Sequence, residues 1–384
     1  MLEDEAIKFF EKAIENYNEK KFDSAEKNFE LALNLSPNRI SILENLASIY
    51  FLNKKFEKAG QVLNKLEELS VDNNKLSEIK FYVLKKLDKH KELQELLKKK
   101  NYFKDINKKI FINSKLLYPS FFNNTREIDK ARSSLIENIK ELNNTKDINL
   151  SLDGERLEPP IFNLSYDQYE NIDVNLKIVE IYRKIYPELN QKFKIKEKNK
   201  KIKIGFISEF FSNHTIGKLF KGIILNLDNE KFQTYVFHSH KTDKSSIFQE
   251  FLKAEKNSNI KNIILSKNFQ KSVDEIVQKN LDIVFFPDIG MSSEFYFLSF
   301  IRFAKIQITS WGHPITTSNK SIDYFLSSKL LETNNSQGRF SEKLILSDYL
   351  PMYFYKPKIK NILSEKEIVK KNLYFCSQNL MKIH

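Results

Sequence analysis

Four apolar runs in the second half of the sequence are followed at once by titratable side chains. Those side chains are His214, the pair His238 and His240, Asp288, and His313. Imidazole and carboxylate groups are the side chains that most often take or give a proton in catalysis. They are also metal ligands, but a close spacing such as His-x-x-x-His is lacking, so the sequence does not favour a metal site. The chemistry that these residues suggest is proton transfer.

Each of these residues also has a purely structural interpretation. His214 could cap the helix that follows it, together with Asn213 and Thr215, whose side chains suit a helix start. Asp288 could belong to a turn before Gly290. His313 could belong to a rigid turn with Pro314. For His238 and His240 we favour the interpretation as ordinary loop residues.

The apolar runs alternate with helical patterns, an order typical of a parallel α/β sheet. The expected strands are Ile202–Ser208, Thr234–Ser239, Ile260–Leu265, Asp282–Pro287, Ile306–Trp311 and a short one at Asp323–Ser327. The expected helices are Ile216–Leu227, Phe248–Ala254, Val273–Lys279 and Glu294–Ala304. In an open parallel sheet all carboxyl ends share one edge, where ligands bind. We therefore expect the histidines and the aspartate to gather on that edge.

Residues 1–100 have helical periodicity and repeat themselves at an offset of 34 residues. Lys20-Lys21-Phe22 recurs as Lys54-Lys55-Phe56, and Ala25 recurs as Ala59. This period, with small residues where helices cross, is the tetratricopeptide signature. A third unit around Phe81–Leu97 keeps the helical pattern but few of the identities. The repeats could be a scaffold that only stacks on its neighbours or a surface that binds peptides, and the sequence leaves both open.

The pattern divides the chain into four parts. Residues 1–100 are the helical repeats, 101–200 a helical bridge, 201–355 the alternating α/β region, and 356–384 a linker followed by a new strand. The bridge contains a break at Pro159-Pro160 and a strongly periodic helix at Asn175–Ile185. It ends in the highly charged run Lys192–Lys201, which we interpret as a solvated connection.

Composition limits the class of protein. The chain has 384 residues, 41% of them hydrophobic, and a formal charge of +13. The lysines are spread among glutamates and asparagines without a nucleic-acid-binding motif, so we favour solvated charge over a nucleic-acid surface. The single cysteine, Cys376, suits a reducing compartment. The acidic N-terminus is unlike a signal peptide, and no apolar run approaches the ~20 residues that span a bilayer, so we expect a cytoplasmic protein without membrane contact.

Short motifs stand at the expected carboxyl edge. They are Ile204-Gly205-Phe206-Ile207-Ser208 followed by Asn213-His214, Pro287-Asp288-Ile289-Gly290-Met291, Trp311-Gly312-His313-Pro314 followed by Thr316-Thr317, and Phe340-Ser341-Glu342-Lys343-Leu344. With these motifs the chain resembles the catalytic region of family 41 glycosyltransferases, the O-linked N-acetylglucosamine transferase and SPINDLY-like group. The resemblance runs from about Phe162 to the end of the sequence. It implies a helical tetratricopeptide solenoid followed by a Rossmann-like parallel α/β lobe of a GT-B enzyme.

The resemblance also implies roles for individual residues. The catalytic candidates are His214, beside donor and acceptor, Asp288, on the acceptor side, and His313, in the loop that faces the sugar. The implied substrate-binding residues are Asn213, Thr215, Gly290, Trp311, Gly312, Pro314, Thr316 and Thr317. Which group takes the proton is left open. The family needs no metal, so the expected ligand is a nucleotide sugar alone and no cofactor.

The end of the sequence resembles the opening strand of the second lobe of the family. The run Leu373–His384 carries Gln378 and Lys382 at the places that bind the nucleotide diphosphate in the family. Because the second lobe supplies most of the nucleotide site, we expect this chain to be an incomplete form with little or no turnover alone.

The leading hypothesis is an inverting glycosyltransferase that moves a hexosyl or N-acetylhexosaminyl group from a nucleotide sugar, UDP-linked by resemblance, to a protein side chain. The helical repeats would bind the protein or peptide acceptor. The alternative from another class is a non-catalytic tetratricopeptide interaction or scaffold protein. The sequence names neither the sugar, nor the acceptor, nor the oligomeric state.

Overall fold

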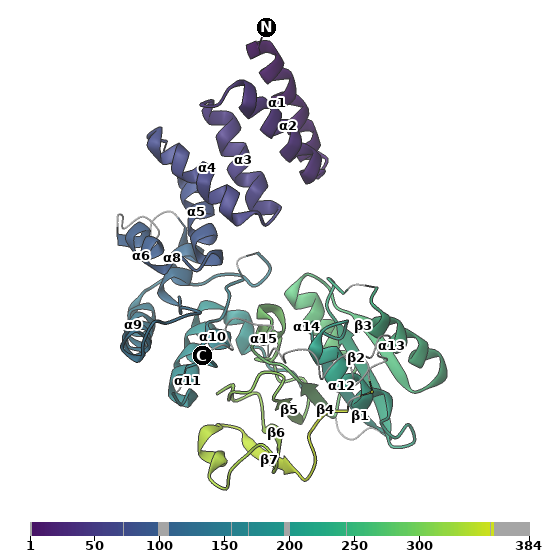
Figure 1. The fold of residues 1–384 in the computed structure, drawn as a ribbon. Coiled ribbons are helices and arrows are strands. Elements are labelled where there is room, and N and C mark those ends of the chain that lie inside the picture. The colour runs from purple at the N-terminus through teal and green to yellow at the C-terminus, as the bar shows by residue number, and fades with distance from the viewer. Residues whose placement is uncertain are drawn as a thin grey trace, which may run out of the picture. The chain divides into compact units, whose positions relative to one another are not determined.

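The structure is a computed structural model that describes residues 2–71, 73–98, 107–154, 156–167, 169–195, 200–242, 244–353 and 355–356. It divides into two compact units. The first comprises Met1–Ser114 and Pro119–Phe121, and the second comprises Lys115–Tyr118 and Phe122–His384. The first unit is helical, and the second contains the sheet (Figure 1). Each unit is described by itself.

The helical unit is built from helical hairpins. The pairs are α1 (Leu2–Asn18) with α2 (Phe22–Leu35), α3 (Ile40–Leu52) with α4 (Phe56–Glu68), and α5 (Asn74–Lys86) with α6 (His90–Lys98), and α8 (Lys108–Lys115) follows them. Ala25 and Ala59 have no exposed surface, as expected of small residues where helices cross. Phe29 and Leu46 fill the core beside them. Burial of this apolar stripe is what holds helices of such modest length in place.

The turn inside each hairpin is the same, and it shows that the third unit is a complete repeat. Lys20, Lys54 and Asp88 stand 34 residues apart and have φ values of 59°, 59° and 55°. In each case the next residue donates its backbone N–H to the carbonyl five residues before it, as Lys89 does to Leu84 over 3.0 Å. A left-handed residue followed by this long backward hydrogen bond is a common helix ending. Backbone geometry therefore preserves the repeat where side-chain identity has been lost.

The second unit contains one parallel sheet of seven strands in the order β3-β2-β1-β4-β5-β6-β7. The strands are β1 (Ile202–Ile207), β2 (Phe232–His238), β3 (Ile260–Ile264), β4 (Ile283–Phe286), β5 (Ile306–Ser310), β6 (Tyr324–Ser328) and β7 (Lys343–Ser347). Every neighbouring pair is parallel, with Ile204 of β1 opposite both Thr234 and Ile283. The expected parallel α/β lobe is confirmed, and the strand order reverses direction between β1 and β4.

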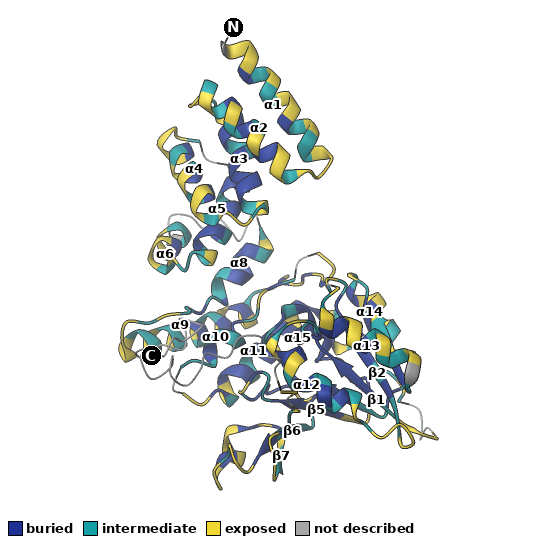
Figure 2. Ribbon diagram, turned by 45° about the vertical axis from the view of Figure 1, so that its right-hand side comes forward, coloured by how far each residue is buried: buried dark blue, intermediate teal, exposed yellow. Residues whose placement is uncertain are grey.

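Helices connect the first five strands. They are α12 (Thr215–Leu225), α13 (Ser246–Asn257), α14 (Phe269–Val277) and α15 (Ser293–Leu298). The central strands are buried, whereas the outer faces of α12, α13 and α14 are exposed (Figure 2). A core cluster that includes Phe206, Phe220 and Phe251 fills the space between the sheet and the helices α12 and α13. Burial on both faces explains the continuous apolar strands.

The expected boundaries of α12 to α15 differ from the structure by one to six residues, and α14 begins at Phe269, four residues before the expected Val273. α13 begins at Ser246 because the side chain of Ser245 accepts a hydrogen bond from the N–H of Phe248 at 3.4 Å. α15 ends at Leu298 and does not continue to Ala304. Strand β7, which the sequence suggested only as a motif, extends the sheet beyond β6. It follows a short 3-10 turn, η2 (Ser336–Arg339).

The bridge region packs on the sheet inside the second unit. It consists of α9 (Thr125–Asn144), α10 (Ile161–Leu164), α11 (Ile172–Ile185) and η1 (Pro187–Asn190). Arg132 of α9 forms a 2.6 Å ion pair with Asp167, which holds α9 to the segment before α11. Arg183 of α11 donates to the carbonyl of Phe300 over 3.2 Å. Through these contacts the bridge supports the loops that leave the sheet.

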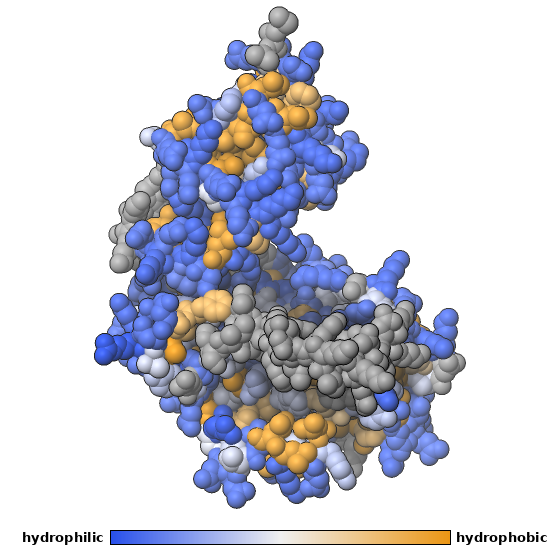
Figure 3. Space-filling model, viewed as in Figure 1, coloured by the Kyte–Doolittle hydropathy of each residue, from blue (hydrophilic) through white to orange (hydrophobic). Residues whose placement is uncertain are grey.

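The visible face of the helical repeats is mostly hydrophilic, with small apolar areas between charged residues (Figure 3). This distribution agrees with charges spread along the sequence. Among the described residues, no helix combines the length and the apolar character that crossing a bilayer requires.

Candidate functional site

The candidate site lies where the strand order reverses, at the carboxyl ends of β1 and β4. Ser208 follows β1 directly, and Asp288 follows β4 after one proline. The Ser208 hydroxyl donates a hydrogen bond to Asp288 Oδ2 over 2.9 Å. In open α/β sheets, ligands bind in the crevice at this reversal. The pair therefore stands at the position where the topology places a reactive group.

Asp288 is an unusual carboxyl group because it is 6% exposed and has no cationic partner among the residues for which contacts are described. Burial raises its pKa to about 7, the hydrogen bond from Ser208 opposes the rise, and the negative charge of Glu209 adds to it. A carboxylic acid with a pKa near neutrality is suited to accept a proton at physiological pH. The raised pKa of Asp288 results from its burial by the fold, because an exposed aspartate has a pKa near 4.

His214 stands at the start of α12 as its cap. Its Nδ1 accepts a hydrogen bond from the N–H of Ile216 over 3.2 Å, and its ring stacks on Phe210 with centroids 4.4 Å apart. Burial, and then the charge of Lys218, lowers the pKa of His214 below its usual value. The ring is therefore neutral at pH 7, and the proton that Nδ1 lacks is carried by Nε2. The side chain offers an N–H donor from Nε2 while Nδ1 is occupied by the helix.

Glycines allow the three loops at this edge to approach closely. A Cβ placed on Gly312 would lie 2.4 Å from Pro287 O, 2.9 Å from Ile216 Cδ1 and 3.0 Å from Asp288 Cβ. A Cβ on Gly217 would lie 2.2 Å from Ser212 O. Only residues without a side chain fit these positions. The loop after β5 thus rests directly on Asp288 and on the first turn of the helix that His214 caps.

His313 is packed inside the protein. It is 2% exposed, its ring stacks on Phe162 with centroids 5.9 Å apart, and a Cβ on Gly290 would lie 2.8 Å from its Nδ1. Burial lowers the pKa of His313 to about 4, so the ring is neutral. Neither ring nitrogen has a hydrogen-bond partner among the described residues. The catalytic role of His313 stays a prediction, and this burial places the ring beneath the loop surface.

The neighbouring loop residues differ in exposure. Trp311 is half-buried, and its Nε1 has no partner in the described part of the chain, whereas Pro314 is exposed. Asn213 and Thr215 are exposed beside His214, and Asn213 Oδ1 accepts a hydrogen bond from Ser246 over 2.9 Å. These positions remain accessible to a ligand, so their predicted roles are compatible with the geometry.

Thr316 and Thr317 already have a protein partner. Thr316 Oγ1 donates to Glu342 Oε2 over 2.7 Å, and both the N–H and the hydroxyl of Thr317 donate to Glu342 Oε1. Asn175 of α11 donates to Thr316 O over 2.8 Å. The two threonines therefore fasten the loop after β5 to the bridge and to β7. Their predicted contact with substrate remains a prediction.

A second polar cluster lies beyond the first, around the buried Glu294 at the start of α15. Its carboxylate is 3.3 Å from Arg156 Nη1, 3.5 Å from His240 Nδ1 and 3.8 Å from Lys241 Nζ. Lys241 also pairs with Glu209 at 3.3 Å. Lys241, on the loop after β2, thus links Glu294 to Glu209, the acid whose charge acts on Asp288. We expect this cluster to fix the loop geometry on that side.

His238 is the last residue of β2 and is fully buried. Its Nε2 lies 3.0 Å from Asn262 Oδ1, and the rings of Phe248 and Phe251 surround it. Burial lowers the pKa of His238 to about 4, so it is neutral. It is a core residue at the end of a strand and not a loop residue as the sequence suggested.

Sequence reasoning overlooked residues that the structure places in or behind the site. They are Ser208, Glu209, Glu294 and Glu342. Ser208 and Glu342 belong to motifs that were recognised, so polar side chains inside those motifs were an available signal. Gln378 and Lys382 lie outside the described residues. Within the described residues, no group of three or more His, Cys, Asp or Glu side chains could hold a metal ion.

Comparisons with known proteins agree with this arrangement. A model described as Glycosyl transferase family 41 matches residues 170–378. The structure is similar to that of a mutant O-GlcNAc transferase from Thermobaculum terrenum, with 12% sequence identity and a TM-score of 0.52 over 90% of this chain and 58% of that chain. This chain thus spans less than two thirds of that relative, and the likeness shows the fold.

Another similar structure is YrrB, described as a TPR protein with an unusual peptide-binding site. It is 15% identical with a TM-score of 0.30, and the match covers 46% of this chain and 86% of that chain. The search of curated proteins found no match.

Proposed function

This chain belongs to glycosyl transferase family 41, and we propose that it carries the acceptor side of an inverting transfer from a UDP-linked sugar to a protein side chain. The observation that supports this proposal best is the buried Ser208–Asp288 pair at the reversal between β1 and β4. The helical repeats would hold the protein acceptor. We further propose a cytoplasmic setting and a reaction that requires no cofactor or metal.

The proposed chemistry is a single displacement. The acceptor hydroxyl oxygen forms a bond to the anomeric carbon while the bond from that carbon to the diphosphate oxygen breaks, which inverts the configuration. The acceptor proton passes to the carboxylate of Asp288, whose pKa of about 7 is matched to neutral pH. The diphosphate leaves with the bonding electrons, and its growing charge needs cationic or dipolar groups.

His214 would act as a hydrogen-bond donor rather than as the base. Its Nδ1 is occupied by the N–H of Ile216, so the neutral ring carries its proton on Nε2. That N–H could orient the acceptor or a sugar oxygen, a contribution to positioning. In this proposal Asp288 accepts the proton of the acceptor, and His214 positions the reacting group by a hydrogen bond.

The test is transfer and hydrolysis of UDP-N-acetylglucosamine and UDP-glucose by this chain and by a version that continues past His384. Asp288→Asn is expected to lower the rate by ~10²–10⁴ in whichever form is active, the usual contribution of a general base. His214→Asn keeps a residue that caps helices well. It is expected to lower the rate by ~10–100-fold without changing the melting temperature, because only the ligand contact is lost.

The matched control is Lys253→Met, which removes an exposed charge on α13 and leaves both proposed groups unchanged, so it should keep the wild-type rate. Full activity in Asp288→Asn would contradict the assignment of the base. Absence of transfer and of hydrolysis in both forms, with binding of a protein through the repeats, would favour the scaffold function.

A further inference from the structure

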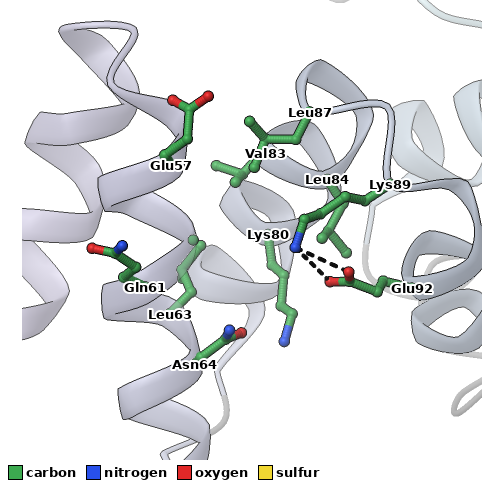
Figure 4. Close-up of a pocket in the computed structure, with 11 residues that line it drawn as sticks. Glu57, Gln61, Leu63, Asn64, Lys80, Val83, Leu84, Leu87, Lys89 and Glu92 are labelled. Atoms are coloured by element: carbon green, nitrogen blue, oxygen red, sulfur yellow. Dashed lines mark hydrogen bonds and ion pairs between the residues drawn. The ribbon is translucent and has the colours of Figure 1, made fainter.

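The helical unit contains a hollow of about 240 Å³ between α4, α5 and the start of α6. Gly60 of α4 faces Val83 of α5 and Leu87, which follows that helix. The side chain of Lys89 lies between α4 and Glu92, with which it forms an ion pair (Figure 4). The hollow lies wholly inside the helical unit. It is therefore independent of the transfer reaction proposed above.

The preceding pair of repeats has a buried carboxylate at the corresponding place. The positions 34 residues earlier, which correspond to Gly60, Leu87 and Lys89 in the preceding repeat, are Glu26, Asn53 and Lys55. Glu26 is 4% exposed; its Oε1 binds Lys55 Nζ at 2.6 Å and its Oε2 accepts from Asn53 Nδ2 at 2.7 Å. In the first interface this carboxylate joins two neighbouring repeats.

The second interface has lost that carboxylate but kept the cation. Gly60 has no side chain, and a Cβ placed on it would meet only Val83 Cγ1 at 3.7 Å and Leu87 Cδ1 at 3.9 Å, which is ordinary contact. Lys89 remains, at the place that Lys55 takes in the first interface. Lys80 stands where the first interface has the buried Leu46, but its ammonium group is held by Glu67 at 2.6 Å, and Glu57 and Glu92 also line the space. The space is thus open, with an apolar wall formed by Val83 and Leu87 and the ammonium group of Lys89 beside it.

The present partner of Lys89 is weakly held. Lys89 Nζ lies 3.0 Å and 3.3 Å from the two oxygens of Glu92, and both side chains are about half exposed. Exposed pairs of this kind contribute only ~0–1 kcal/mol, so exchange for another carboxylate costs little. In the first interface the lysine at the corresponding position is exposed to a similar extent, but its carboxylate partner, Glu26, is buried.

We infer that this hollow binds the carboxylate of an acidic side chain supplied by a partner protein, which takes the place that Glu26 takes in the first interface. The methylene groups of the incoming side chain would lie against Val83 and Leu87, and its carboxylate would bind Lys89. A complementary charge over an apolar wall selects an acidic side chain over its neutral amide, because the amide cannot form the charge-assisted bond.

The experiment is a titration of the full chain, labelled with ¹³C at Val and Leu methyl groups, with N-acetyl-glutamate N-methylamide. The methyl signals of Val83 and Leu87 are expected to shift. The glutamine analogue of the same probe is the control, and it should shift them at least tenfold less at equal concentration, because it lacks the charge. Equal shifts with both probes, or no shift at the solubility limit of the glutamate probe, would overturn the inference.

Two variants make the location of binding decisive. Gly60→Glu places a carboxylate in the hollow from the protein itself and should abolish the shifts. Gly60→Ala is its matched control and should bind the probe within about twofold of the wild type, since a Cβ fits there in ordinary contact. Lys89→Met should weaken binding by about tenfold, the loss of one charge-assisted bond of roughly 1.4 kcal/mol. Unchanged binding in Gly60→Glu and Lys89→Met would place the probe elsewhere and refute the site.

Discussion

Two buried carboxyl groups of almost equal exposure have opposite surroundings in the two units. Glu26 in the helical repeats is 4% exposed and is held by a lysine and an asparagine, whereas Asp288 at the sheet edge is 6% exposed and has one serine hydroxyl and a nearby acid. The first arrangement satisfies the charge and stabilises the fold. The second leaves the charged form disfavoured. The contrast teaches that the repeats are built for stability and the sheet edge for reactivity.

The largest expected effect comes from neutralising Asp288. Its pKa of about 7 lies above the ordinary value of 3.8, so its contribution to stability is complete below about pH 4 and is lost as the pH rises through 7. Asp288→Asn keeps an acceptor for Ser208 without the charge. At pH 8 it should stabilise the sheet unit by up to about 4 kcal/mol, since the pKa difference is worth ~1.4 kcal/mol per unit. Urea unfolding at pH 4 and at pH 8 measures this difference.

The control for that prediction is Asn334→Ser, an exposed and non-titratable change on the same unit, which should keep the wild-type stability at both pH values. If Asp288→Asn were destabilised equally at both pH values, the contrast between the two carboxyl groups would fail.

A smaller effect separates two helical glycines, one from each unit. Gly217→Ala should destabilise the sheet unit by ~2–3 kcal/mol, because its Cβ would lie 2.2 Å from the backbone oxygen of Ser212 and force the loop before α12 to move. Gly60→Ala should stabilise the repeats by ~0.5–1 kcal/mol, because alanine favours the helix and its Cβ fits. Thermal unfolding of each variant checks the sign, and the same sign in both would contradict the different packing of the units.

An effect smaller than that of Gly217→Ala comes from removing the satisfied carboxylate of Glu26. Glu26→Ala should destabilise the helical repeats by ~1–2 kcal/mol, since Asn53 loses its partner and Lys55 is exposed enough to turn to water. Glu19→Ala is the control and should cost less than ~1 kcal/mol, because its pair with Lys21 is exposed on both sides. The measurement is the midpoint of chemical unfolding of the helical unit. A cost for Glu26→Ala no larger than that of its control would contradict the stabilising role of the buried carboxylate.

The sequence predicted most of the fold because its signals are local. Apolar runs of strand length predicted β1 to β6 within a few residues, and the 34-residue offset predicted the repeats. The third repeat was only weakly visible, since its identity resides in the left-handed turn at Asp88, which tolerates different side chains. The residue at which a helix such as α15 ends depends on how the following turn packs, and the periodicity of apolar residues contains no information on that packing.

The sequence predicted where the candidate site lies, but not which of its side chains are buried or already hydrogen-bonded to the protein. The alternation of strands and helices placed Asp288 and His214 at one edge, and the strand order agrees with that. Depth could not be predicted: His313 is buried by Phe162, which lies far away in the sequence, and Thr316 is held by Glu342. Whether a polar side chain faces a ligand or the protein depends on such distant contacts. These contacts are not encoded in the spacing of a motif.

The place of β1 in the middle of the sheet has a consequence for how the chain acquires its structure during synthesis. One of the two neighbours of β1 in the sheet is β4, where Ile204 pairs with Ile283. The centre of the sheet therefore cannot form until the long segment between these two strands has left the ribosome. The repeats contact mainly their sequence neighbours and can fold as each hairpin emerges. We expect the helical unit to be structured while the nascent sheet still awaits its partner strands, an interval in which chaperones would engage the exposed β1 region.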